Sequence, residues 1–404
     1  MDFDDSPGEA AFRSAARTWL EANAKPRSDA GSRRTDPAGH VEECKRWQRT
    51  LHEGGWAGLT WPVEYGGRGA TPIEAAIFAQ EQAGFDVATG IFAVGIGMVG
   101  PTLIAHGTPA QKERYLDPLL RGEEVWCQLF SEPGAGSDLA GLSTRAVADG
   151  DEWVVNGQKV WTSGAQHSDW GILLARTDPS VPKHRGITYF LVDVRSPGIE
   201  VRPLRQINGA AHFNEVFLTD VRVPDGQVVG PVQGGWGPAL TTLANERTFI
   251  GSGTGAGWDD LAGLARSTGG CADPRIRQEL ASAYTRWALM RYLGFRVQTA
   301  LSHGRPPGAE SSILKLLYSQ HLSRTADVVL AMQGVSGALI GDDAEASGFW
   351  ADYFLTQWAS RIGGGTDQIQ RNVIGERVLG LPAEPRVDKQ IPFDQLGRVP
   401  GTRG

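Results

Sequence analysis

The sequence predicts an α+β protein in which a helical N-terminal region is followed by a β region and then by a second helical region. Helix-start signals recur in the first part of the chain, short β-branched and aromatic runs separated by turn residues follow, and helical spacing of apolar residues then returns. The domains are therefore placed at residues 1–122, 123–232 and 233–384, with a tail at 385–404.

The composition is that of a folded chain and argues against several classes of function. The chain has 404 residues, of which 41% are hydrophobic and 21% charged, and a net charge of -7. The length exceeds one ordinary domain of roughly 100–200 residues, and the acidic balance argues against binding to nucleic acid or anionic membrane. The three cysteines lie far apart without metal-ligand spacing, and the first residues are acidic, unlike a targeting peptide. We expect a cytoplasmic protein.

The N-terminal helices are predicted by three capping boxes. Each has a hydroxyl residue, a proline and then a Glu or Gln, at residues 6–9, 71–74 and 108–111. Behind the first box, one helical stripe is apolar, formed by Phe12, Ala15, Ala16, Trp19 and Leu20.

An uncharged stretch at residues 87–105 is long enough to cross a membrane. It contains four glycines and Pro101 and is flanked by capped helices, so we interpret it as a buried core helix without a membrane span. Gly95 to Gly100 also match the G-x-G-x-x-G pattern of dinucleotide-binding folds. We treat this match as chance, because Thr108 starts a new helix where that fold would need to continue towards a second strand.

The β region, at residues 125–223, predicts an antiparallel sheet or barrel, and its segment 128–138 is typical of a ligand-binding turn. Gly134 and Gly136 allow positive φ values that would direct successive amides towards one point, which suits phosphate oxygens. Ser131 and Ser137 add hydroxyl donors. An ordinary tight turn explains this segment equally well.

A second candidate site follows the turn signal Asn156-Gly157. Alternate residues of a strand share a face, so Trp161 and Ser163 would present an aromatic plane and a hydroxyl together, a pairing that suits a flat heterocycle. A tryptophan packed in the sheet core is the alternative.

The C-terminal region predicts helices at about 236–252, 274–303, 310–333 and 366–379. Before the last of them, three glycines at 363–365 precede Thr366, an N-cap candidate. A glycine loop that runs into a helix N-terminus can hold an anion or a carbonyl oxygen, and a flexible linker is the alternative.

Glu246 is the candidate general base. It lies on the helix predicted at 236–252, three or four positions from Leu243, Phe249 and Ile250, so its carboxylate falls on the apolar stripe. Burial would raise its pKa towards the range useful for proton abstraction. A structural ion pair, with Arg247 beside it, is the alternative.

Taken in this order, the motifs resemble the acyl-CoA dehydrogenase family over nearly the whole chain. The segments that carry the resemblance are SEPGAGSD, NGQKVWTSG, HFNEVFLTDVRVP, NERTF and GGGTDQIQRNVIGERVLGLP. The resemblance implies an N-terminal helical domain, a central antiparallel β-barrel or sandwich, and a C-terminal four-helix bundle. It also implies FAD as the cofactor, α,β-dehydrogenation of an acyl-CoA thioester, an electron-transfer flavoprotein as the electron acceptor, and assembly as tetramers.

The same resemblance implies roles for individual residues. The flavin should be lined by Gln128, Phe130, Ser131, Gly136, Ser137, Trp161, Thr162 and Ser163, with Ser163 near flavin N5. The adenosine part of FAD should be reached by Thr366 and Gln368. The acyl-CoA should be bordered by Ser137, Arg247, Gly364 and Gly365.

The sequence departs from the commonest family pattern in two places. Gly364 stands where many members carry the catalytic glutamate, and the chain resembles members acting on long-chain or branched acyl groups, whose glutamate takes the position of Glu246. Residues 264–270 lack the Arg-x-x-Phe-Gly-like signature that contacts a neighbouring subunit's FAD. A homotetramer and a heterotetramer with a related subunit therefore both remain open. A non-catalytic partner subunit and a flavin monooxygenase or oxidase of the same fold are the alternative functions.

Overall fold

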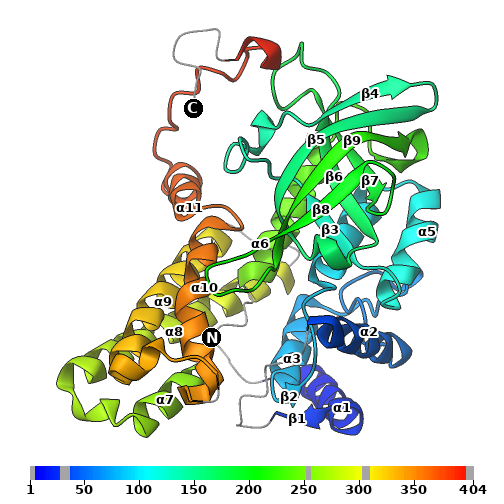
Figure 1. Cartoon of the computed structure of the whole chain (residues 1–404). Helices are drawn as coiled ribbons and strands as arrows, with labels where there is room; N and C mark the ends of the chain where they lie inside the picture. Colours follow the sequence, from blue (N-terminus) through cyan, green and yellow to red (C-terminus); the bar gives the residue numbers. More distant parts are fainter. Residues whose placement is uncertain (1–4, 28–36, 252–255, 303–309, 342, 397–404) are drawn as a thin grey trace. The chain divides into compact units, whose positions relative to one another are not determined.

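The computed structural model describes residues 5–27, 37–251, 256–302, 310–341 and 343–396, with only the backbone described at 37–38, 247–251, 301–302 and 310. Contacts divide the chain into two compact units, each assembled from segments that are distant in sequence. The first unit contains residues 1–35, 71–86 and 247–383, and the second contains 36–70, 87–246 and 384–404. Figure 1 shows the elements of both, coloured along the chain.

The first unit is almost entirely helical. Its helices are α1 (Pro7–Asn23), α3 (Pro72–Gln82), α7 (Trp258–Ser267), α8 (Pro274–Ser302), α9 (Glu310–Gln333), α10 (Phe349–Ile362) and α11 (Asp367–Val373). Two short strands, β1 (Lys25–Pro26) and β2 (Phe85–Asp86), pair antiparallel. Helix α9 packs against α7, α8, α10 and α11. The buried core of the first unit includes Leu261, Leu280, Leu322, Val329 and Trp350.

The capping boxes are confirmed. At Ser6, Thr71 and Thr108, the cap side chain accepts a hydrogen bond from the amide three residues on, and the side chain at that position accepts one from the cap amide. Along the predicted apolar stripe of α1, Ala16 and Leu20 are fully buried, whereas Ala15 is exposed.

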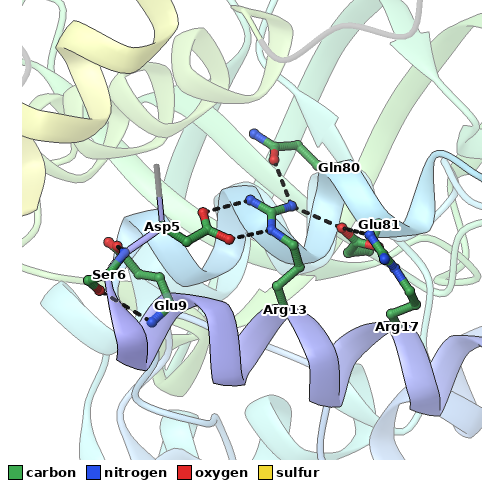
Figure 2. A network of polar contacts seen from close by, with 7 residues as sticks. All are labelled: Asp5, Ser6, Glu9, Arg13, Arg17, Gln80 and Glu81. Carbon is green, nitrogen blue, oxygen red and sulfur yellow. Dashed lines mark hydrogen bonds and ion pairs between the residues drawn. The ribbon is translucent and has the colours of Figure 1, made fainter. Parts of the chain in front are cut away.

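Charged side chains join α1 to α3, as Figure 2 shows. Arg13 donates from Nε to Asp5 Oδ2 (2.6 Å) and from Nη1 to Glu81 Oε1 (2.9 Å). Arg17 Nε donates to Glu81 Oε2 at 2.8 Å. The hydrogen bond from Arg17, with that from Arg13, holds the pKa of Glu81 below its usual value, so the carboxylate stays charged between the two helices.

The second unit combines four helical segments with an eight-stranded sheet. The helices are α2 (Pro37–Glu53), α4 (Gly100–His106), α5 (Pro109–Leu120) and α6 (Trp236–Gly251) as far as Glu246. The strands are β3 (Trp126–Leu129), β4 (Arg145–Asp149), β5 (Glu152–Ser163), β6 (Trp170–Arg176), β7 (Ile187–Asp193), β8 (Ile199–Leu204), β9 (Phe213–Pro224) and β10 (Val228–Val229).

The predicted α+β class, with a helical, a sheet and a second helical region in this order, is confirmed, but the sheet is not a closed antiparallel barrel. Over the described residues its strand order is open, β10-β7-β6-β4-β5-β9-β8, with β3 beside β6. Strand β3 runs parallel to β6 and β4 meets β6 in parallel, while the other pairs are antiparallel. The sheet is therefore mixed and not a closed barrel.

Both faces of β6 and β7 are buried. One core places Leu103, Leu116 and Leu120 of the helices against Ile172 and Leu191 of the sheet. The other core joins the opposite face of these strands to β5 and β9 through Leu173, Phe190, Val155 and Val216. Burial on both faces explains why β6 and β7 read as continuous apolar runs rather than alternating ones.

The glycines at 95–100 permit close packing and do not form a dinucleotide site. A π-helical turn, Gly95–Val99, leads directly into α4. A Cβ on Gly100 would lie 1.8 Å from Cζ2 of Trp61, and one on Gly95 would lie 2.4 Å from Cδ1 of Leu119. The predicted core helix is real from Ala93 onward, but residues 87–92 are not helical. No helix among the described residues has the length and apolarity needed to cross a membrane.

Two helices of the first unit, α7 and α10, were not predicted from the sequence. The helix predicted at 366–379 is α11 followed by a π-helical turn at Ile374–Val378. The tail belongs to the second unit, where residues 392–394 contact residues 179–182 through their backbone.

Candidate active site

A buried ion pair fixes the segment that contains the predicted ligand-binding turn. Lys159 of β5 is fully buried, and its Nζ donates to Glu132 Oε1 (2.8 Å) and to the carbonyl of Phe130 (3.0 Å). Glu132 also accepts from the amides of Ser143 (2.6 Å) and Thr144 (2.9 Å). Burial alone would raise the pKa of Glu132, but Lys159 and these donors outweigh it and bring that pKa to about 2.

The turn at residues 132–137 does not form the predicted amide nest. Neither Gly134 nor Gly136 has a positive φ. Instead, Glu132 and Ala135 each donate an amide hydrogen bond to the other's carbonyl at 3.0 Å, which closes the turn in ordinary backbone conformations. A Cβ on either glycine would have no neighbour within 4 Å, and Ser137 is exposed, so this surface is open to a ligand.

The end of β5 carries a strained aromatic residue. Trp161 has φ +61° and lies at a register shift between Lys159 and Thr162. Its side chain is 62% exposed, which excludes the alternative that it packs in the sheet core. Ser163 is exposed as well, whereas Val160 and Thr162 are buried. A non-glycine residue at this φ costs of order 1–3 kcal/mol, and such strain is typical of functional sites.

Thr162 supplies a second unusual feature beside that indole. Its side chain is 1% exposed, and its Oγ1 has no hydrogen-bond partner among the residues that the structure describes. Its carbonyl accepts from Asn214 Nδ2 at 2.9 Å, and Oδ1 of the same amide is also buried with no partner in the described part of the chain. Buried polar atoms are costly unless they are satisfied. An exposed indole plane, a neighbouring exposed hydroxyl and unsatisfied polar atoms together suit a flat ring with polar edges, such as a flavin.

Glu246 lies near the candidate flavin residues within the second unit. It is half-buried, and its Oε2 is 3.5 Å from Nε2 of Gln128 on β3. One turn earlier on α6, Thr242 Oγ1 lies 3.1 Å from the hydroxyl of Tyr189 and 2.9 Å from Oγ1 of Thr102. These buried contacts fix α6 against β7 and α4, and therefore the position from which Glu246 projects.

Further contacts link Tyr189, which fixes α6, to the end of β5. Tyr189 meets the buried ring of Phe130 edge-on, with centroids 5.8 Å apart. Ser131 is half-buried, and its carbonyl accepts from the amide of Val160 at 2.9 Å. The backbone of the turn is thus tied to β5 next to Trp161.

In the first unit, the glycine loop is held in a defined shape. Gly364 and Gly365 have φ of 63° and 85°, values that favour glycine. Gln370 Nε2 donates to both their carbonyls, at 3.2 and 3.3 Å. Thr366 accepts from the amide of Ile369 at 3.2 Å, which confirms the predicted N-cap.

Helix α11, which follows this loop, is held by buried polar contacts at Asp367, whereas the predicted ligand residue Gln368 is exposed. Asp367 is buried and accepts from Ser319 Oγ at 2.6 Å, with Lys315 Nζ at 3.5 Å and Arg361 Nε at 3.3 Å. Gln368 is exposed. The loop is therefore a fixed structural element and not a plain linker.

Comparison with known proteins decides the family. Residues 6–123, 127–221 and 233–379 match the models described as the N-terminal, middle and C-terminal domains of acyl-CoA dehydrogenase. The chain belongs to the acyl-CoA dehydrogenase family. It is therefore an oxidoreductase, and membership implies a flavin cofactor.

Two curated relatives and one solved structure illustrate the similarity. Acyl-CoA dehydrogenase FadE34 of Mycobacterium tuberculosis is 43% identical over 346 residues, covering 85% of this chain and 47% of FadE34, so the chain spans about half of that relative. Acyl-CoA dehydrogenase IpdE1 of the same organism is 38% identical over 384 residues, covering 93% of this chain and 98% of IpdE1. The structure titled Tcur3481-Tcur3483 steroid ACAD matches with a TM-score of 0.82 and 30% identity, over 95% of this chain and all of that one.

Within this acyl-CoA dehydrogenase, the second unit brings together most of the predicted site residues. Glu246 and the residues of β3, of the turn and of the end of β5 all belong to it. The predicted residues Gly364, Gly365, Thr366 and Gln368 belong to the first unit. The side chain of Arg247, like those of Phe249 and Ile250, lies outside the described residues.

The sequence analysis missed the residues that hold this site in place. Glu132 and Lys159 stand inside two of the recognised motifs, and a charged residue of each sign next to predicted ligand residues was an available signal. Thr102, Tyr189 and Thr242 gave no signal, because their contacts join segments far apart in the chain.

Proposed function

We propose that this acyl-CoA dehydrogenase uses FAD to desaturate an acyl-CoA thioester between its α and β carbons, and that an electron-transfer flavoprotein accepts the electrons. The observation that carries the proposal is the position of Glu246, half-buried on an anchored helix and 3.5 Å from Gln128. Bound FAD supplies the acceptor for the β-hydride.

Glu246 removes the α-proton in this proposal. A carboxylate that is partly withdrawn from water is a stronger base, and its efficiency depends on being aimed at the proton. The Gln128 amide donates to one carboxylate oxygen, and Thr242 fixes the helix one turn before. Enolate-like charge on the thioester oxygen requires preorganised donors, and we assign the amide of Gly364 to that role.

The cofactor contacts follow from the arrangement at the end of β5. We assign Trp161, Thr162 and Ser163 to the flavin ring, because they present an indole plane, an unsatisfied hydroxyl and an exposed hydroxyl. Gln128, Phe130, Ser131, Gly136 and Ser137 complete the flavin side, and Thr366 and Gln368 take the adenosine. Ser137 and Gly365 also border the acyl-CoA, together with Arg247.

The acyl group is proposed to be bulky. Gly364 offers no side chain at the position where many family members carry a glutamate, which leaves space for a branched or ring-bearing substrate. The solved relative whose title names a steroid ACAD supports this class. Anaerobic titration with straight, branched and steroid-like acyl-CoAs would rank these substrates by the extent of flavin bleaching.

The Glu246→Gln variant tests the proposed base. We expect it to bind FAD as the wild type does but to lose bleaching by acyl-CoA, since the amide cannot accept the α-proton. The exposed Glu113 of α5 provides a matched control, and Glu113→Gln should bleach normally. Retained bleaching in Glu246→Gln would remove this residue from the mechanism.

A partner subunit of a heteromeric dehydrogenase is the second candidate function. It is favoured by the missing Arg-x-x-Phe-Gly-like signature at residues 264–270 and by the solved relative whose title pairs two proteins. This candidate predicts that the purified chain alone is nearly colourless. A yellow chain that is reduced by acyl-CoA and then reoxidised rapidly by dioxygen would instead indicate an oxidase or monooxygenase.

A further inference from the structure

The last described residues of the chain return to the second unit and contact the loop between β6 and β7. We call residues 388–394 the C-terminal strap. The amide of Phe393 donates to the carbonyl of Val181, and that of Asp394 to the carbonyl of Pro179, both at 3.0 Å. Pro392 forms an isolated bridge with Pro182. The strap thus pairs with the loop through its backbone.

Lys183 connects the strap to the turn that carries Ser137. Its Nζ lies 2.5 Å from Asp388 Oδ2 and 2.8 Å from Asp138 Oδ2, and its side chain is only 10% exposed. Burial alone would lower the pKa of Lys183, but the hydrogen bonds that its ammonium donates to the two carboxylates outweigh burial and raise that pKa. The ammonium therefore stays charged and bridges two segments that are far apart in sequence.

Arg176 makes a second connection between the same segments. This buried guanidinium donates to the carbonyls of Ala140 (2.6 Å), Leu142 (3.1 Å) and Lys183 (3.1 Å). The ring of Phe393 covers it, with the ring centroid 3.5 Å from Cζ. Residues 138–142 directly follow Ser137, so strap and loop together hold the C-terminal side of the turn.

The opposite side of the turn has its own support. Glu132 and Lys159 fix its start, whereas a Cβ on Gly134 or Gly136 would meet nothing within 4 Å. Between the Glu132–Lys159 pair and the Lys183–Asp138 contact, the turn is exposed. The position of its side chains towards a ligand therefore depends on how firmly both of its ends are held. The C-terminal strap supports the C-terminal side of this turn.

We propose that the C-terminal strap is a positioning device for acyl-CoA, in which Asp388 and Lys183 hold Asp138 so that Ser137 faces the thioester substrate. This inference rests on the proposed function, which assigns Ser137 to the acyl-CoA. Lys183 and Asp388 are positioning residues and take no part in proton or hydride transfer.

Variants of the bridge test the proposal. Lys183→Met and Asp388→Asn should raise KM for acyl-CoA roughly three- to tenfold, the equivalent of one partly exposed ion pair, with kcat within about twofold. Flavin content should change little, because the proposed flavin residues of β3 and of the end of β5 keep their own anchors. Lys183→Arg keeps the charge and should restore KM to within about twofold. Glu200→Gln, which breaks an exposed ion pair with Arg202 on β8, is the matched control and should leave KM unchanged.

Phe393→Ala provides a second route that keeps the ion pairs, and it should also raise KM. Unchanged KM in Lys183→Met and Phe393→Ala would overturn the proposal, and so would a parallel loss of kcat, flavin and thermal stability, which marks a purely structural role. Calorimetric titration with coenzyme A distinguishes a failure of the strap proposal from a failure of the proposed function. A wild type that never bleaches with acyl-CoA contradicts the function, whereas equal coenzyme A affinity in wild type and variants contradicts the strap.

Discussion

At the scale of single residues, the backbone conformation of Trp161 lowers stability and is explained by a role in the site. A side chain at φ +61° is strained by about 1 kcal/mol or more, and the exposed indole recovers little of this by burial. Natural proteins keep such strain where it serves a site. Its neighbour Thr162 shows the same pattern, because its own buried hydroxyl has no hydrogen-bond partner among the described residues.

Replacing Trp161 should therefore affect binding and stability in opposite directions. Trp161→Gly is expected to raise the free energy of unfolding, or leave it unchanged, with a gain of up to about 1 kcal/mol because glycine adopts positive φ without strain. The same change should lower flavin content. Urea denaturation and the ratio of flavin to protein absorbance measure the two effects. A Trp161→Gly protein that is clearly less stable, or fully loaded with flavin, contradicts this view.

At the scale of elements, the bond between Lys159 and Glu132 ties β5 to the turn after β3. Lys159→Met should lower the free energy of unfolding at pH 7 by about 3–5 kcal/mol, since it leaves a buried carboxylate without its cation. Lys159→Met combined with Glu132→Gln should recover part of this loss. Urea denaturation of both proteins is the measurement, and equal instability of the single and double variants would argue against the pair.

The acid limb of the stability curve gives an independent check on the same pair. The pKa of Glu132 falls from 4.5 to about 2 on folding. Its contribution is therefore fully present above pH 4.5 and is lost as pH falls towards 2. Glu132→Gln should flatten stability in this window, where the wild type declines.

Elements with local signals were predictable from the sequence, and elements that depend on distant contacts were not. The three capping boxes and the Thr366 cap follow from a few adjacent residues, and all are present. The parallel pairing of β3 with β6 depends on residues more than forty positions apart, for example Trp126 opposite Trp170, and no local pattern encodes it. The prediction of an amide nest was wrong because the backbone amides of Glu132 and Ala135 donate to each other's carbonyls instead.

The candidate site shows the same division. The motifs predicted Glu246, Trp161 and Ser163 as site residues because each lies in a short pattern with a chemical meaning, and these assignments stay predictions. The strap could not be predicted because Lys183 and Asp388 are 205 positions apart in the sequence, and their contact exists only in the folded chain.

At the scale of the whole molecule, the second unit is interleaved with the first along the chain. Residues 36–70 and 87–246 belong to one unit although residues 71–86 between them belong to the other. Trp61 of the earlier segment is buried, donates from Nε1 to the carbonyl of Ile96 at 3.2 Å, and occupies the space that Gly100 leaves. Gln48 donates to the carbonyl of Leu120 at 2.8 Å.

A fragment of residues 87–246 alone should therefore lack a complete core, because the helical face of its sheet would lose Trp61 and the residues around it. We expect it to unfold without a sharp transition in urea and to show weak near-ultraviolet circular dichroism. A chain in which residues 36–70 are joined by a flexible glycine-serine linker to 87–246 should regain a cooperative transition, since the missing indole returns to its place. Trp61→Ala in that joined chain should abolish the gain, as removal of a buried tryptophan costs about 3–5 kcal/mol. Cooperative unfolding of residues 87–246 without the earlier segment would mean that the sheet and its own helices suffice.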